Sequence, residues 1–419
     1  MIILGLILLL LALLGAPLFV IIAASAMWGY YSAGISLAVV PIEIFRIAEM
    51  PILLAIPLFT FAGYLLSESG APRRLVRLTS ALMGWMPGGL AIVSLAVCAL
   101  FTAFTGASGV TIIALGALLY PALAQAGYKE NFNLGLVTSA GSLGLLFAPS
   151  LPLILYGVVA QISIDELFLA GIFPGILMLI MLSAWCLWVN RGIRIPFDQF
   201  SWREVGQAVA EAKWEIPLPV IVLGGIYSGY FAVSEAAAVT ALYVIVIDVF
   251  VLREIKLSQL PRIIRESMIL VGGILIILGV SLASTTYMID EGVPQKILAV
   301  INQYVTSQVS FLVLLIVFLL ILGAILDIFS ALVLVVPLIL PIGESYGVHP
   351  VHLGIIFLAT MQLGYLTPPV GLNLFIASYR FEKSITRIYA ATVPFLLILF
   401  LSVLVIAFVP RLSLLLLGQ

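Results

Sequence analysis

The chain has 419 residues, of which 63% are hydrophobic and 9% are charged, and its formal net charge at pH 7 is −1. Soluble domains carry about 25% charged residues, so this composition excludes a soluble protein, and the near-neutral charge gives no indication of a nucleic-acid partner. Apolar stretches long enough for transmembrane helices nearly tile the sequence. We therefore expect an all-α polytopic protein of the lipid bilayer, not a β-barrel, because the alternating pattern of barrel strands is missing.

Ten apolar segments are predicted to cross the bilayer. In chain order they are roughly 2–24, 28–45, 51–67, 131–160, 163–189, 216–229, 232–252, 266–288, 351–379 and 388–410. The first has no basic residues before it and is too long for the apolar region of a signal peptide, so we expect it to be a span.

Two further apolar stretches, about 88–126 and 309–345, are interrupted by small polar residues. The first interruption reads FTGASGVT (104–111) and the second reads LDIFSAL (326–332). Irregular backbone is tolerated at membrane depth only where protein buries it or where it lines a cavity. We interpret both stretches as re-entrant helical hairpins with functional tips; a simple pair of crossings is the alternative.

Two of the predicted spans are also broken, at SAGSLGLLFAPSLP (139–152) and at QLGYLTPPVGLN (362–373). Proline removes an amide donor and interrupts a helix. The freed carbonyls are suitable Na⁺ ligands, and the N-termini of the half-helices attract an anion. Two hairpin tips that face two broken helices therefore predict a paired site near mid-membrane. Small residues elsewhere, such as Gly116 and Gly135, indicate close helix packing instead.

Two halves of the sequence resemble each other. ESGAPRRLV (68–76) matches DEGVPQKIL (290–298), and LGLLFAPS (143–150) matches LGYLTPPV (363–370), at offsets of 222 and 220 residues. If the N-terminus lies outside, fifteen of the Lys and Arg residues fall on the cytoplasmic side and three fall outside. The two matching units then enter their hairpins from opposite sides, which predicts an inverted-topology repeat, a signature of many secondary transporters.

The predicted domain organisation follows from this repeat. The first repeat covers 1–190, with scaffold helices, the hairpin at about 88–126 and the broken helix at about 131–160. Residues 191–215 form an amphipathic connector on the cytoplasmic surface, and the shorter basic segment 253–266 is expected to lie on that surface in the same way. The second repeat covers 216–419, with scaffold helices, the hairpin at about 309–345, the broken helix at about 351–379 and a final helix. Both termini are predicted to be periplasmic.

Few charged residues are candidates for a role inside the membrane. Asp327, at the second tip, is the clearest, since a carboxylate there is costly unless it is paired or bound to a cation. A helix-capping role is the alternative. The apolar segments contain no cluster of acids or histidines, so we predict no catalytic residues, no metal site other than Na⁺ and no enzymatic activity.

The segment GGIYSGYFAVSEAAAVTALYVIV (224–246) resembles the large permease subunits of TRAP transporters, the DctM-like proteins. LGYLTPPVGLNLF and AGSLGLLFAPSLPLILYG look like the broken-helix segments of the same family, and the resemblance extends over essentially the whole chain. It implies an elevator-type permease of the bacterial inner membrane that imports an organic anion, a carboxylate such as a C4-dicarboxylate or a sugar acid, with a Na⁺ gradient. It also implies two partners, a small four-helix membrane subunit and a periplasmic substrate-binding protein.

The resemblance further implies which residues hold the ions and the solute. The first Na⁺ site falls on Thr105, Gly106, Ser108, Gly144 and Pro149. The second Na⁺ site falls on Asp327, Ser330, Gly364, Thr367 and Pro368. The solute is expected at Ser108, Gly109, Ser150, Pro369 and Asn373.

The chain departs from the family pattern at several motifs. It has AVSE (232–235) where the family often has TPTE, and DIFSA (327–331) where the family often has DTTPA. These departures bear on the solute and on the coupling ions, not on the fold. Two alternatives stay open: a self-sufficient anion symporter driven by Na⁺ or H⁺, which needs no binding protein, and a membrane scaffold subunit that does not transport.

Overall fold

The computed structural model describes residues 7–8, 10–11, 14–86, 88–191 and 200–418, and their regular secondary structure is entirely helical. Within this part of the chain, eight helices are long and apolar enough to cross a membrane. The predicted all-α polytopic fold is therefore confirmed. Residues 2–6, 9, 12 and 13 of the predicted first span, 2–24, lie outside the described residues, and α2 begins within that span at Leu18.

The elements of the first half are α2 (Leu18–Ser32), α3 (Val39–Ala48), η1 (Pro51–Leu54), α4 (Ala55–Glu68), α5 (Ala71–Met83), α6 (Gly89–Thr105), α7 (Ser108–Gln125), α8 (Glu130–Ala140), η2 (Leu143–Leu146), α9 (Leu151–Ala160) and α10 (Ile164–Asn190). After the connector helix α11 (Trp202–Glu211) come α12 (Pro217–Tyr227), α13 (Val233–Ile245), the π-helical η3 (Val246–Val251), α14 (Leu260–Asp290), α15 (Val293–Ile301), α16 (Gln308–Ile325), α17 (Ile328–Ser345), α18 (Pro350–Gly364), α19 (Leu372–Phe381), α20 (Ile385–Phe408), α21 (Arg411–Leu414) and η4 (Leu415–Leu417).

Three predicted elements need correction. The boundary between the first two spans is wrong, because α2 runs through residues 25–27 and the chain turns at 33–38 instead. The predicted span 216–229 contains α12, which has 11 residues and at 1.5 Å per residue is too short to cross alone. Residues 253–266 are not a separate surface helix, since α14 begins at Leu260. The predicted connector, by contrast, contains a helix, α11, and its place on the cytoplasmic surface stays a prediction.

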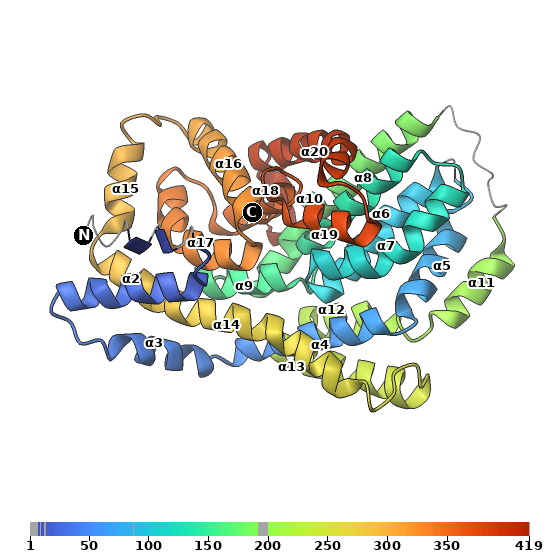
Figure 1. Cartoon of the computed structure of the whole chain (residues 1–419), viewed down its shortest axis with the longest axis horizontal. Coiled ribbons are helices and arrows are strands. Elements are labelled where there is room, and N and C mark those ends of the chain that lie inside the picture. Colours follow the sequence, from blue (N-terminus) through green and yellow to red (C-terminus); the bar gives the residue numbers. More distant parts are fainter. Residues whose placement is uncertain (1–6, 9, 12–13, 87, 192–199, 419) are drawn as a thin grey trace.

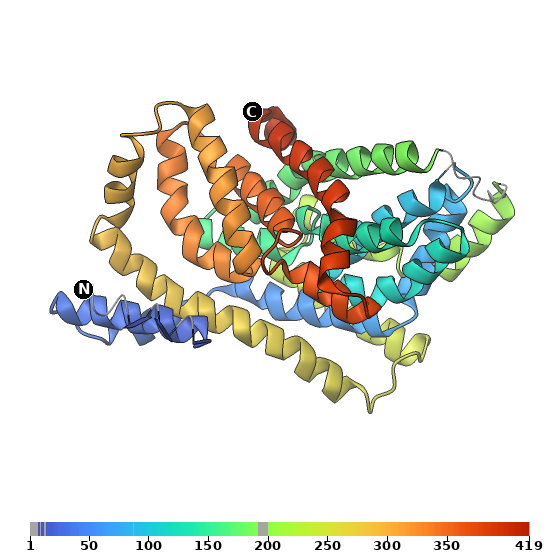
Figure 2. The same ribbon diagram turned by 45° about the horizontal axis from the view of Figure 1, so that its top comes forward.

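The helices form two layers, as Figure 1 shows. One layer contains α2, α3, α4, α13 and α14, with α14 in contact with α2, α3 and α4. Figure 2 shows α14 running along most of the molecule beneath the other layer. That second layer holds both interrupted hairpins, both broken helices and the long helices α10 and α20. The largest buried cluster of apolar side chains lies mainly in this second layer.

Both predicted hairpins are present as pairs of consecutive helices. In the first, α6 and α7 are joined by Gly106 and Ala107, and Gly106 has φ = 65°, a conformation that favours glycine. In the second, α16 and α17 are joined by Leu326 and Asp327. Helices α7, α16 and α17 each have the length and hydropathy of a membrane span, so re-entrance stays a prediction.

Both predicted broken helices are confirmed. The first consists of α8, η2 and α9, with a bend of 43° at its break. The second consists of α18 and α19, separated by residues 365–371. Their second halves end alike, at Gln161 with φ = 57° and at Glu382 with φ = 53°. These two residues are 221 positions apart, close to the offset of the sequence repeat.

Glycine allows each hairpin to approach its own broken helix closely. A Cβ added to Gly144 would lie 2.2 Å from the carbonyl oxygen of Ala99 and 2.5 Å from the amide of Ala103 in α6. In the second half, a Cβ added to Gly364 would lie 2.5 Å from the Cα of Gly323 in α16. Because the opposing atoms belong to the backbone, neither contact leaves room for a side chain.

We expect Gly144→Ala and Gly364→Ala each to lower the thermal unfolding temperature of the purified protein, since overpacking costs about 1–3 kcal/mol. Gly272→Ala in α14 is the matched control, because nothing lies within 4 Å of its added Cβ and alanine is about 1 kcal/mol more favourable than glycine inside a helix. Melting curves that show equal losses for all three variants would contradict this packing.

An ion-pair cluster holds α5 against the chain around it. Arg74 Nε donates to Glu215 Oε1 at 2.7 Å, and its guanidinium also pairs with Glu254. Glu254 Oε2 accepts a hydrogen bond of 2.7 Å from the backbone amide of Gly70, just before α5. Partial burial opposes ionisation of Glu254, but the hydrogen bonds from Arg74 and Gly70 hold its pKa below the usual value. The side chains of Arg74 and Glu215 are only 14% and 5% exposed.

Arg74→Met is expected to lower the unfolding temperature markedly, because it leaves the buried carboxylate of Glu215 without its cationic partner and removes the same partner from Glu254. Breaking a buried pair costs about 3–5 kcal/mol, and we expect the lower end because Glu254 is 29% exposed. Arg262→Met is the control: its pair with Glu68 is 50% and 37% exposed, and exposed pairs contribute at most about 1 kcal/mol. Similar melting curves for the two variants would contradict the conclusion that the Arg74 cluster stabilises the fold more than the exposed Arg262–Glu68 pair does.

Candidate functional site

The first hairpin tip lies directly on the first broken helix. A Cβ added to Gly106 would lie 2.5 Å from Leu151 Cγ, at the start of α9. Thr102 Oγ1 donates to the carbonyl oxygen of Gly141 at 2.8 Å and lies 2.7 Å from Thr111 Oγ1. Both threonine side chains are completely buried. This cluster of three oxygens brings α6, α7 and the end of α8 together.

Thr102, Thr111 and Gly141 are absent from the predicted ion ligands. Their signal in the sequence is weak, because a threonine inside an apolar helix commonly bonds its own backbone. Thr60 and Thr138 do so here, each donating to the carbonyl four residues earlier.

The same tip also contacts the second half of the chain. Ser108 Oγ donates to Asn373 Oδ1 at 2.7 Å, which joins the first turn of α7 to the first turn of α19. Asn373 Nδ2 and Ser150 Oγ are buried and have no hydrogen-bond partner within the described residues. The structure thus brings together two residues predicted to bind the solute, Ser108 and Asn373, and leaves an amide donor available beside them.

Three helix N-termini near this tip have no side-chain cap. They are those of α7, after Ala107; of α9, after Ser150; and of α19, after Gly371. The first amide groups of a helix have no partner within the helix and carry partial positive charge. Anions are stabilised at such positions. The uncapped amides and Asn373 Nδ2 therefore make this part of the molecule suited to a negatively charged group.

The second tip is arranged differently, because the first amides of α17 already have side-chain hydrogen-bond acceptors. Asp327 Oδ1 accepts hydrogen bonds from the amides of Phe329 and Ser330 at 2.9 and 3.0 Å. Ser330 Oγ donates to the other carboxylate oxygen at 2.5 Å. Asp327 is exposed, whereas Ser330 is buried. The structure thus shows the capping arrangement for Asp327, and its role in ion binding stays a prediction.

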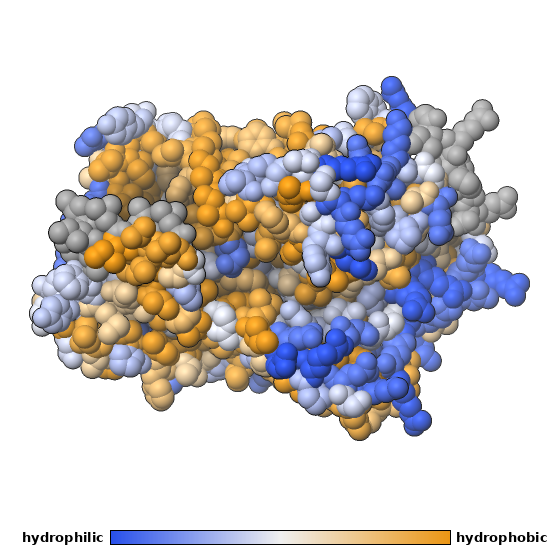
Figure 3. All heavy atoms as spheres, in the orientation of Figure 1, coloured by the Kyte–Doolittle hydropathy of each residue, from blue (hydrophilic) through white to orange (hydrophobic). Residues whose placement is uncertain are grey.

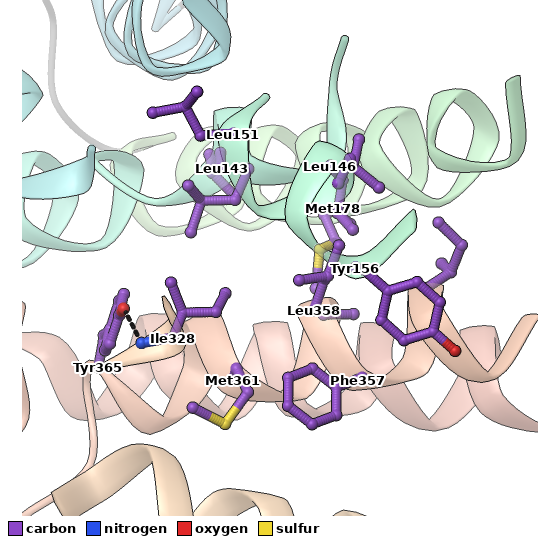
Figure 4. Close-up of a cluster of buried hydrophobic side chains, with 14 of the residues drawn as sticks. Leu143, Leu146, Leu151, Tyr156, Met178, Ile328, Phe357, Leu358, Met361 and Tyr365 are labelled. Carbon is purple, nitrogen blue, oxygen red and sulfur yellow. Dashed lines mark hydrogen bonds between the residues drawn. The ribbon is translucent and has the colours of Figure 1, made fainter. Parts of the chain in front are cut away.

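Tyr365 supplies the remaining partner at the second tip. Its hydroxyl oxygen accepts a hydrogen bond of 2.6 Å from the amide of Ile328, the first residue of α17 (Figure 4). The amide of Gly371 in turn donates to the carbonyl oxygen of Ala324 in α16 at 3.2 Å. These two bonds fix the second tip to the second break. Sequence reasoning missed Tyr365, since a tyrosine in an apolar segment is ordinarily a packing residue.

The two breaks face each other across a shared apolar core. Figure 4 shows Leu143, Leu146 and Leu151 of the first broken helix opposite side chains of the second half. Those opposing side chains include Ile328, Leu358 and Met361, and all six are buried. Hydrocarbon side chains therefore fill the space between the first break and this part of α17 and α18.

The predicted site residues divide by burial. Thr105, Gly106, Ser108, Gly144, Pro149, Ser150, Ser330, Gly364 and Asn373 are buried. Gly109 and Thr367 are partly exposed, and Asp327, Pro368 and Pro369 are exposed. Thr367 Oγ1 donates to the carbonyl oxygen of Leu363 at 3.0 Å, and the Pro369 carbonyl oxygen accepts from the Tyr389 hydroxyl at 2.8 Å. Gly144 and Gly364 serve the close backbone packing described above.

Comparison with known proteins identifies the family. Residues 4–412 match the family described as "Tripartite ATP-independent periplasmic transporter, DctM component". The chain is 34% identical over 374 residues to the C4-dicarboxylate TRAP transporter large permease protein DctM of Pseudomonas aeruginosa, covering 89% of this chain and 88% of that protein. It is 35% identical over 360 residues to the isethionate TRAP transporter permease protein DctMQ of Oleidesulfovibrio alaskensis, covering 85% of this chain and 57% of that protein.

The fold also resembles a solved structure, that of the YdaH transporter of Alcanivorax borkumensis. The TM-score is 0.58 at 13% sequence identity, with 88% of this chain and 86% of that chain covered. The predicted family resemblance is confirmed by these matches, and the relatives are transporter subunits, not enzymes. The chain belongs to the DctM family and is the multi-pass large permease component of a tripartite ATP-independent periplasmic transporter.

Proposed function

We propose that this chain is the conducting subunit of a Na⁺-driven importer for an organic anion. It works in the bacterial inner membrane with a periplasmic binding protein and a small four-helix membrane subunit. Relatives named for C4-dicarboxylates and for isethionate support an acidic solute, since the first are carboxylates and the second is a sulfonate. Both termini are periplasmic in this proposal.

The observation that carries the proposal is the uncapped helix ends at the first tip. The N-termini of α7 and α19 lie side by side, joined by the bond between Ser108 and Asn373, and neither has a side-chain cap. A carboxylate or sulfonate placed there receives backbone amides and the unpaired amide of Asn373. Gly109, Ser150 and Pro369 border this region.

Sodium ions are proposed to bind beside each tip. At the first, Thr102 Oγ1, Thr111 Oγ1 and the carbonyl oxygen of Gly141 form a buried group of uncharged oxygens. Gly141 follows the last residue of α8, and carbonyl groups where a helix unwinds coordinate Na⁺ in other transporters. Thr105, Gly106, Ser108 and Pro149 are next to this group of oxygens. At the second, the oxygens are those of Asp327 and Pro368, which are exposed, of Thr367, which is partly exposed, and of Ser330, which is buried.

The two layers support an elevator mechanism. Each hairpin contacts its own broken helix and also the second half of the other: α7 contacts α19, and α17 contacts α9. This reciprocal packing is what an inverted-topology repeat produces. We propose that the hairpins and broken helices move as one body against the layer of α2, α3, α4, α13 and α14. The hydrogen bond between Ser108 at the first tip and Asn373 in the second half argues against a subunit that serves only as a scaffold. The family membership favours a transporter that works with a binding protein over a self-sufficient symporter.

The first test follows thermal unfolding of the purified protein against NaCl, with KCl and choline chloride as controls. A ligand that binds only the folded state at a hundredfold excess over its Kd stabilises it by about 2.7 kcal/mol. We expect a saturable rise in unfolding temperature that is specific to Na⁺ and is reduced by Thr102→Val.

Thr240→Val is the matched control for Thr102→Val. Thr240 is also a buried threonine whose hydroxyl donates to a carbonyl, that of Ala236, but it lies in α13 of the other layer. It should lower stability without changing the Na⁺ response. A folded wild-type protein with no Na⁺-specific shift would remove Na⁺ coupling from the proposal and leave the family assignment intact.

A second prediction concerns Asn373. In proteoliposomes with the two partner subunits, we expect Asn373→Asp to lower uptake at least about tenfold, because a new carboxylate at the helix N-termini repels an anion. Uptake is measured with a panel of labelled C4-dicarboxylates and sulfonates. Asn373→Ser keeps a neutral donor and should lose less, and both variants should keep their Na⁺-dependent stabilisation. Wild-type uptake by Asn373→Asp would exclude this site for the solute.

A further inference from the structure

An apolar groove lies between α15 and the two arms of the second hairpin. Its cavity volume is about 310 Å³, and its lining exposes only apolar atoms. Six of the side chains that line it are Ile297 and Ile301 of α15, Phe311 and Leu315 of α16, and Val335 and Ile339 of α17. The groove is remote from the tip of this hairpin, which is formed by Leu326 and Asp327.

The groove exists because the second hairpin is packed more loosely than the first. Helices α16 and α17 contact each other over less of their length than α6 and α7 do, and α15 contacts α17 and α14. The first-half counterpart α5 also borders a pocket, but there the start of α12 supplies a wall with Ile216, Leu218 and Pro219. No described segment supplies a corresponding wall at the groove beside α15.

One end of the groove is closed by a polar contact at the ends of the helices. The rings of Phe311 and Tyr346 stack with centroids 4.8 Å apart. The Tyr346 hydroxyl oxygen lies 2.5 Å from Asn302 Oδ1 and 2.9 Å from the carbonyl oxygen of Val305. An amphipathic aromatic residue in this position marks the level of the lipid headgroups.

The side of the groove is continuous with the surface that faces lipid. Leu314 and Phe318 line the groove and are also 46% and 43% exposed. They belong to α16, which has the hydropathy of a membrane span. Figure 3 shows a strongly hydrophobic surface in this region, over α16. A chain in the surrounding lipid therefore reaches the groove without crossing any polar group.

We propose that one acyl chain of a phospholipid occupies this groove as a fixed part of the structure, with its headgroup near Tyr346. An apolar cavity stays free of water, and an empty one leaves its lining without dispersion contacts on one side. The acyl chain restores these contacts and acts as a wedge between α15 and the base of the hairpin. This inference rests on the membrane location alone, not on the proposed solute or ions.

The test is native mass spectrometry of the detergent-purified protein after extended washing. The wild-type protein should retain one phospholipid. Leu314→Trp and Leu338→Trp, which enlarge side chains that line the groove, should retain at least about fivefold less. Val317→Trp is the matched control, because Val317 lies one turn from Leu314 on α16, is 49% exposed and is not in the groove lining; it should retain lipid as the wild type does.

Two variants that fill the groove, Leu314→Trp and Leu338→Trp, are used so that the test still works if one of them does not fold. A single symmetric peak in size-exclusion chromatography checks the folding of each variant. A folded wild-type protein without retained phospholipid would overturn the proposal. So would equal retention by the filling variants and the control. Detergent that occupies the site and is not replaced by phospholipid after reconstitution, or a protein chain that copurifies on this face, would also overturn it.

Discussion

A helix that stops inside a bilayer leaves amide and carbonyl groups without hydrogen-bond partners, because lipid offers none and water is absent. The arrangement of this protein depends on which groups become the hydrogen-bond partners of each such helix end. At α17 the amides are bonded by Asp327 and Tyr365. At α6 the carbonyl of Thr102 is capped by the amide of Gly106. The N-termini of α7, α9 and α19 have no side-chain cap, and we propose that the solute is bound there.

Helix ends can find these partners within the protein because the backbones of neighbouring segments approach each other closely. Gly144 and Gly364 allow each broken helix to touch the hairpin beside it without an intervening side chain, which buries the unwound segments in protein rather than in lipid. Yet the two halves use the same geometry for different chemistry. The first tip gathers uncharged hydroxyl and carbonyl oxygens around Thr102, whereas the second has a carboxylate at the surface.

The positions of the breaks are predictable because glycine and proline interrupt helices through their own covalent structure, independently of the fold. The hairpin links and both breaks follow from that signal, whereas Ser108 and Asn373 are placed in one site only through the family resemblance. The contacts of Thr102 and Tyr365 do not follow from that signal, because they join residues 37 to 39 positions apart and a hydroxyl in an apolar helix has many possible partners. The boundary near residues 25–27 fails for a related reason: an apolar run without a helix breaker does not show where one helix ends.

The hydrogen bond between Ser108 and Asn373 has a consequence for how the two halves of the chain can move. It joins residues 265 positions apart, one from each half, and α17 with α9 makes the reciprocal contact. The group proposed to hold the solute draws one residue from each half, so a displacement of either half alone would separate Ser108 from Asn373. In the proposed transporter, the link between the first tip and the start of α19 is therefore a property of chain topology and not of any single residue.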